Sequence, residues 1–183
     1  MGEVVNPPPS PAVRKQVESM AEPSEPSSSR PLVLMRFRPV WTYIDGVREF
    51  CRFFCATTFK TSDLAERASV VVQETLENAV KYSTGGDDAE LELCIESHGE
   101  KIEFSVSSVP DPLHLPMLRA ELSSIASQTP EQAYVAAFLR AAAEPDGASR
   151  LGLARIVHEG RTALSMQEEP GGRIRITATG TVC

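Results

Sequence analysis

The sequence predicts an α+β fold: a two-layer sandwich in which a mixed, mostly antiparallel sheet carries helices on one face. The first observation is a pair of segments, 89–96 and 102–106, in which apolar and polar residues alternate on either side of a short turn. This period of two predicts a hairpin with one buried and one wetted face. The second observation is the helical spacing of apolar residues before and after this hairpin. The third is a closing pair of strand-like segments, 163–166 and 173–181, joined through Pro-Gly-Gly.

The remaining elements rest on local patterns of the same kind. The mostly apolar segment 32–38 predicts the first strand, which ends at Pro39. Apolar residues three and four positions apart predict one helix around 47–54 and a second over 61–82, whose start has the spacing of a capping box. Three further helical patterns follow the hairpin: 116–127, 130–144 and, after a loop, 151–157.

The length of 183 residues predicts one folded domain with an appendage. Of the 14 prolines, seven lie within the first 31 residues, beside a run of serines. Such a segment cannot bury enough apolar surface to offset its ordering entropy. We therefore expect a disordered Pro/Ser-rich tail at 1–30, in which 12–20 could form a short helix, and a folded domain at 31–183. A Pro-rich docking peptide is the alternative interpretation of the tail.

Composition and charge argue against two classes of function. The net charge is −7, and Lys and Arg are not clustered as they are in proteins that neutralise phosphates of nucleic acids. No apolar run approaches the roughly 18 residues of a membrane-spanning helix, and the N-terminus does not read as a secretion signal. We expect a protein that binds neither nucleic acid nor membrane.

The four cysteines predict a reducing compartment. They form no C-x-x-C pair, and no histidine lies at a metal-ligand spacing from them. We expect reduced cysteines of the core in a cytoplasmic protein, namely Cys51, Cys55, Cys94 and Cys183.

The segment 72–83 contains the candidate site. On a helix, Glu74 and Asn78 lie four residues apart on one face, and Lys81 continues the same ridge. A carboxylate, an amide and an ammonium group on one stripe can handle a hydrated Mg²⁺ ion and a polyphosphate. The alternative is a solvated helix face that carries these residues by chance.

The pattern Glu74-x-x-x-Asn78-Ala79-x-Lys81-Tyr82-Ser83 resembles the N box of the histidine-kinase-like ATPase superfamily, GHKL. The resemblance covers about 31–181 and implies a Bergerat-type fold that binds ATP and Mg²⁺. It implies that Glu74 polarises an attacking water or hydroxyl, that Asn78 ligates Mg²⁺ and that Lys81 contacts phosphate.

Two further segments extend the resemblance and also depart from it. The segment 151–157 is similar to the later glycine box, of which only Gly152 remains, and this implies that backbone amides near Gly152 hold phosphate. Arg150 offers phosphate a fork of donors, and the alternative is a surface arginine. In the family an aspartate followed by two glycines reads adenine. Here Asp111 stands at that position, with prolines on both sides and no glycines. The place of the ATP lid, 113–148, has a helical pattern.

The resemblance is strongest to small stand-alone members that act as anti-sigma-factor or partner-switching serine kinases. It implies a bacterial signalling regulator with a serine/threonine kinase-like domain, which binds or phosphorylates a small regulatory protein of the sigma-factor or antagonist type. A homodimer is compatible with this resemblance. Because glycines are lost, the alternative is a degenerate pseudo-ATPase that works as a protein-interaction module without nucleotide chemistry.

Overall fold

The computed structural model describes residues 31–84, 89–143 and 151–183. The predicted tail at 1–30 and the candidate residue Arg150 lie outside the described residues. Both therefore stay predictions.

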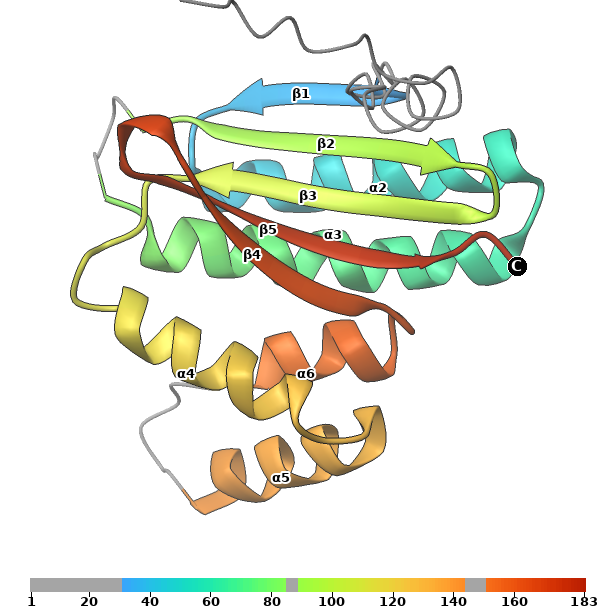
Figure 1. Cartoon of the computed structure of the whole chain (residues 1–183). Helices are drawn as coiled ribbons and strands as arrows, with labels where there is room; N and C mark the ends of the chain where they lie inside the picture. The colour runs from blue at the N-terminus through green and yellow to red at the C-terminus, as the bar shows by residue number, and fades with distance from the viewer. Residues whose placement is uncertain (1–30, 85–88, 144–150) are drawn as a thin grey trace, which may run out of the picture.

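The sheet has five strands in the spatial order β1-β2-β3-β5-β4 (Figure 1). All four pairings are antiparallel, so the sheet contains none of the parallel pairing that a mixed sheet would have. The predicted α+β sandwich with helices on one face is confirmed. The strands are β1 (Val33–Phe37), β2 (Leu91–His98), β3 (Lys101–Ser108), β4 (Ala163–Glu169) and β5 (Arg173–Thr181).

Five helices of the described chain form the second layer: α2 (Trp41–Phe59), α3 (Ser62–Tyr82), α4 (Leu115–Ala126), α5 (Pro130–Ala143) and α6 (Leu151–His158). Helices α2 and α3 lie behind the sheet in Figure 1, and α4, α5 and α6 lie beyond β4. Helix α2 is longer than the predicted 47–54, because its buried stripe extends from Ile44 to Cys55. No helix in the described ranges is long and apolar enough to cross a membrane.

The core lies between the inner face of the sheet and the two long helices. The alternating apolar residues of the hairpin point inward, as the period of two predicts, and they meet the apolar stripe of α3. Each large aliphatic side chain removed from water contributes about 2 kcal/mol. The largest fully buried side chains include Leu64, Leu76, Leu91, Leu93, Ile95, Ile102 and Ile156.

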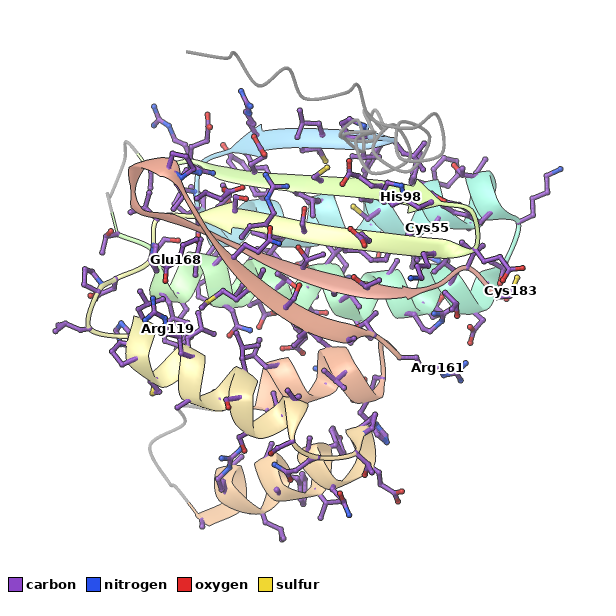
Figure 2. All side chains as sticks on the ribbon, viewed as in Figure 1. Cys55, His98, Arg119, Arg161, Glu168 and Cys183 are labelled. Carbon is purple, nitrogen blue, oxygen red and sulfur yellow. The ribbon has the colours of Figure 1, made fainter. Side chains whose placement is uncertain are left out.

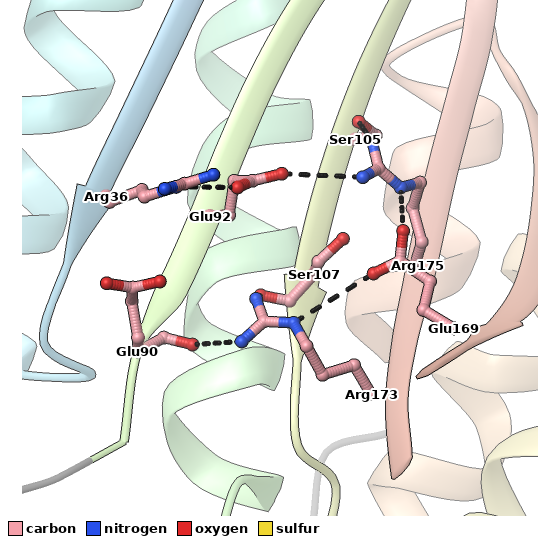
Figure 3. Close-up of polar contacts among 8 residues, drawn as sticks. All are labelled: Arg36, Glu90, Glu92, Ser105, Ser107, Glu169, Arg173 and Arg175. Atoms are coloured by element: carbon pink, nitrogen blue, oxygen red, sulfur yellow. Dashed lines mark hydrogen bonds and ion pairs between the residues drawn. The ribbon is translucent and has the colours of Figure 1, made fainter. Parts of the chain in front are cut away.

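The outer face of the sheet is polar, but its side chains are less exposed to solvent than the alternating sequence pattern predicts. Arg175 reaches Glu169 at 2.6 Å and Glu92 at 3.4 Å, and Arg36 binds Glu92 at 2.8 Å (Figure 3). The aliphatic parts of long side chains can cover a surface while their charged ends stay hydrated. Ser105 and Ser107 are buried on this face, and Arg175 lies 3.3 Å from the Ser105 hydroxyl.

An ion pair also joins the helical region to the edge of the sheet. Arg119 on α4 contacts Glu168 on β4, and Figure 2 shows the two side chains where these elements approach each other. Both side chains are more than half exposed, so the pair contributes well below about 1 kcal/mol.

The cysteines divide into two groups. Cys51, Cys55 and Cys94 are buried and free, as predicted, whereas Cys183 is exposed at the chain end (Figure 2). The prediction of a core position is therefore wrong for Cys183, because an apolar helical or strand pattern surrounds only the other three. Burial raises the pKa of the Cys51 and Cys55 thiols to about 12.

This division predicts one fast-reacting thiol in the native described chain. At about pH 8, a thiol with a pKa near 12 is ionised to roughly one part in 10⁴, and it is also shielded from the reagent. We expect Cys183 to react with a disulfide reagent within the mixing time, and the other three thiols to react only after denaturation. Loss of the fast phase in Cys183→Ser checks the assignment, and a second fast thiol in that variant would contradict it.

Candidate functional site

Helix α3 places the predicted stripe at the edge of the core. Glu74, Asn78 and Lys81 share one face of this helix, while Val72 and Leu76 point into the core. Although Glu74 is charged, its exposed fraction is only 8%, because α6 packs against this part of α3. The stripe therefore runs from the joint between two helices, where Glu74 is buried, through the half-buried Asn78 to the exposed Lys81.

A cavity of about 440 Å³ opens at this joint. Its size falls in the range of about 300–1,000 Å³ that small-molecule sites occupy. The structure brings four of the predicted site residues to this one cavity, although they come from two helices. The lining residues are Trp41, Glu74, Glu77, Asn78, Lys81, Leu151, Gly152 and Arg155.

Gly152 permits the close approach of α6 to α3. A Cβ atom at this position would lie 2.6 Å from Glu74 Oε2 and 3.3 Å from Asn78 Nδ2. Only a residue without a side chain can start α6 here without displacing the two candidate groups. Within the described structure, Asn78 Nδ2 is buried and has no hydrogen-bond partner. It is thus a donor without an acceptor, beside a polar cavity.

Arg155 is a residue of the site that sequence reasoning missed. Its guanidinium forms an ion pair with the Glu74 carboxylate and binds Glu159 through two nitrogens, at 2.9 and 3.0 Å. The only signal in the sequence is that Arg155 and Glu159 lie four residues apart on one helix. The contact of Arg155 with Glu74, 81 residues away, needs the fold.

Burial and the guanidinium act in opposite directions on Glu74. Burial raises the pKa of its carboxyl group above the usual range, and the neighbouring Arg155 opposes this rise. The Arg155 hydrogen bond lowers the pKa of Glu159. The candidate base, Glu74, is therefore a poorly hydrated carboxylate whose charge the Arg155 guanidinium neutralises. This carboxylate can orient a hydroxyl group only if Arg155 moves away from it.

A second, apolar cavity of about 50 Å³ lies between α3, α4, α6 and the sheet. At roughly 15 Å³ per water position it has room for a few water molecules and not for a nucleobase. Helix α4 forms one wall of the cavity through Met117 and Leu118, opposite Tyr82 of α3 and Ile176 of β5.

The predicted adenine-reading residue is engaged in its own loop. The Asp111 carboxylate accepts a hydrogen bond from the Leu113 amide at 2.9 Å and lies 3.3 Å from His114 Nδ1. Asp111 is not among the residues that line either cavity. Its side chain organises the turn that leads into α4, a role that aspartate commonly has in loops.

The predicted lid forms two helices in its described part. The apolar residues of these two helices fall into a buried group and an exposed group. Ile125 of α4 is buried, whereas Val135, Phe138 and Leu139 of α5 are exposed. Tyr134 stacks on His158 of α6 at 4.7 Å, which fixes α5 against α6.

These residues fit one half of an ATP and Mg²⁺ complex. The larger cavity offers the Asn78 amide, the Lys81 ammonium group and the tight start of α6, which suit a cation and phosphates. The half that would receive the base does not fit in this conformation, because the cavity beside α4 measures only about 50 Å³ and Asp111 bonds within its own loop.

Comparisons with known proteins support the fold alone. No protein-family profile matches the chain, and no curated protein sequence matches it. A chain in the crystal structure of the SiaB-SiaC complex from Pseudomonas aeruginosa is similar in structure, with a TM-score of 0.63 and 19% sequence identity. The match covers 92% of this chain and 95% of that chain. Almost the whole described architecture is therefore shared with a protein that has been crystallised in a complex of two proteins.

Proposed function

We propose that this chain is a signalling regulator that binds a small partner protein and that carries a site for ATP and Mg²⁺ of the serine/threonine kinase type. The observation that supports it is the convergence of Glu74, Asn78, Lys81 and Gly152 on one cavity of about 440 Å³. The likeness to a chain from a two-protein complex supports a protein partner.

The roles of the residues follow from their chemistry. Asn78 offers an amide oxygen to Mg²⁺ and an N–H donor to phosphate, and Lys81 adds positive charge at the same edge of the cavity. Bound ATP and Mg²⁺ supply a phosphoryl group whose charge the cation neutralises. Glu74 orients a serine or threonine hydroxyl of the partner and accepts its proton, once Arg155 has moved away from the carboxylate.

Calorimetric titration with ATP and Mg²⁺ tests the site. We expect the wild-type chain to bind and Asn78→Ala to lose at least about tenfold in affinity, because the variant loses a buried polar partner worth about 1.4 kcal/mol or more. Glu66→Ala is the matched control, since Glu66 lies on the exposed face of the same helix. Equal affinity of Asn78→Ala and wild type, or no binding at millimolar nucleotide, would contradict the proposal.

A second candidate function is a protein-interaction module without nucleotide chemistry. The small size of the apolar cavity, about 50 Å³, and the pairing of Glu74 with Arg155 favour it. It predicts a thermal unfolding curve that no nucleotide shifts and a partner affinity that Glu74→Ala leaves unchanged. ATP-dependent phosphorylation of a partner that purifies with the chain would exclude this candidate.

A further inference from the structure

A histidine and two glutamates meet on the outer face of the sheet, across the sheet from the cavity between α3 and α6. Glu96 and His98 belong to β2, and Glu103 belongs to β3. One histidine nitrogen and one oxygen of each carboxylate lie within 4.8 Å of one another. Figure 2 shows His98 at the end of β2. We call these three residues the hairpin cluster. Their donors are of the kinds that bind a divalent metal ion.

The register of the hairpin brings the cluster together. Glu96 lies directly opposite Glu103, and His98 follows Glu96 by two residues, so all three side chains point to one face of the sheet. Gly99, with a φ of 65°, and Glu100 form a two-residue turn between the strands. Such a turn fixes the register, and pairing with β5 holds β3 on its other side. The sheet therefore holds the backbone of all three donors in place before an ion binds.

The two carboxylates of the cluster repel each other in a way that a bound cation would relieve. Like charges directly opposite each other destabilise a pair of strands. Both Glu96 and Glu103 are half-buried, so salt screens this repulsion less than it screens fully exposed charges. The Thr179 hydroxyl of β5 donates a hydrogen bond to Glu103 Oε1 at 3.4 Å. A hydrogen bond from outside the cluster orients a ligating carboxylate in this way.

We propose that the hairpin cluster binds a divalent transition-metal ion of the Zn²⁺ class. The imidazole of His98 selects Zn²⁺ over Mg²⁺ and Ca²⁺, which prefer oxygen ligands alone. Zinc binds nitrogen and carboxylate oxygen at about 2.0–2.2 Å, so two donors on one ion lie at most about 4.4 Å apart. Small side-chain rotations bring the three donors within this limit. The ion links β2 to β3, and water completes its coordination because His98 is exposed.

Lys101 competes with a metal ion for these carboxylates. It lies opposite His98 and two residues before Glu103, so its exposed side chain is on the same face. Replacing it removes a positive charge beside the ion without changing a ligand. We expect Lys101→Gln to bind Zn²⁺ about threefold more tightly than wild type.

Calorimetric titration of Zn²⁺ into the full chain tests the site. A Cys183→Ser background removes the exposed thiol as a zinc ligand. We expect one Zn²⁺ ion to bind, and His98→Gln and Glu103→Gln each to lose at least about tenfold in affinity. Glu100→Gln is the matched control, because this exposed carboxylate lies in the same hairpin and outside the cluster. Mg²⁺ is expected to bind at least about a hundredfold more weakly than Zn²⁺.

Spectroscopy and unfolding assign the ion to the cluster. We expect Zn²⁺ to shift the imidazole NMR signals of His98 and to leave those of His114 and His158 in place, since these two rings contact Asp111 and Tyr134. Zn²⁺ is expected to raise the Tm of the wild-type chain and not that of either cluster variant.

Unfolding without metal shows that the variants are folded. Their Tm is expected to match that of wild type, because the changed side chains lie on the solvent side of the sheet. A zinc affinity that neither His98→Gln nor Glu103→Gln lowers overturns the proposal. So do His98 signals that Zn²⁺ does not move, and so does Mg²⁺ that binds as tightly as Zn²⁺.

Discussion

Replacing Arg155 by alanine is expected to lower the free energy of unfolding by about 2 kcal/mol near neutral pH. The variant leaves the buried Glu74 carboxylate without its cation and removes the partner of Glu159. Removing one member of a fully buried pair costs about 3–5 kcal/mol, and the value here is lower because a third of the Arg155 side chain is exposed. Urea denaturation monitored by circular dichroism measures the change.

The pH dependence of this loss has a definite sign. Burial raises the pKa of Glu74 in the folded state, so its ionisation costs stability as the pH rises above the unfolded value. Without Arg155 that cost grows, and protonation of the Glu74 carboxylate at lower pH removes it. Glu159 has a lowered pKa and contributes stability above its unfolded value, which the variant loses. The Glu159 contribution is present at both pH 5 and pH 8, so the raised pKa of Glu74 is what makes Arg155→Ala more destabilising at about pH 8 than at about pH 5.

A double-mutant cycle separates the charge from the packing. The variant Glu74→Gln, Arg155→Ala carries no buried carboxylate at position 74, so we expect it to be more stable at neutral pH than Arg155→Ala alone. Arg119→Ala is the control, because its ion pair with Glu168 is exposed and is worth well under about 1 kcal/mol. The loss of unfolding free energy in Arg155→Ala could instead be equal at both pH values and remain when Glu74→Gln is added. That result would show that Arg155 acts through packing alone.

The elements that sequence alone predicts are those with a strict period. The hairpin of β2 and β3 follows from alternation, and its register places Ile95 opposite Phe104 on the inner face. The stripe Glu74, Asn78 and Lys81 follows from helical spacing in the same way. Periodicity identifies which residues share a face, and the faces of this domain are regular.

The features that cannot be predicted from the sequence depend on which elements pack against each helix or sheet face. Arg155 reaches Glu74 across 81 residues, and Trp41 comes to the same cavity from the start of α2. Nothing local distinguishes these side chains from surface residues, because their role arises from the packing of α6 and α2 around α3. The arginines over the outer sheet face are similar, since alternation predicts that Arg175 points outward but not that it covers Ser105.

Shortening Leu118 is expected to raise the affinity for ATP and Mg²⁺, if the proposed function holds. Leu118 lines the apolar cavity of about 50 Å³ and packs against the core from α4. A nucleobase needs more space than this, so α4 must move outward before the base can enter beside α3. The observed affinity is then the intrinsic affinity reduced by the fraction of molecules in which α4 has moved.

The expected size of this gain follows from the cost of displacing one half-buried leucine. Leu→Ala at a fully buried site removes about 2–5 kcal/mol of packing, and the lower end suits a side chain that packs only partly against the core. If about 1.4 kcal/mol of this packing energy stabilises the conformation in which α4 has not moved outward, Leu118→Ala makes the apparent Kd about tenfold lower. Leu139→Ala on the exposed face of α5 is the control and should leave the Kd unchanged. Weaker binding by Leu118→Ala would instead place this side chain in contact with the bound nucleotide, and α4 would then be a wall of the site whose closure does not limit entry.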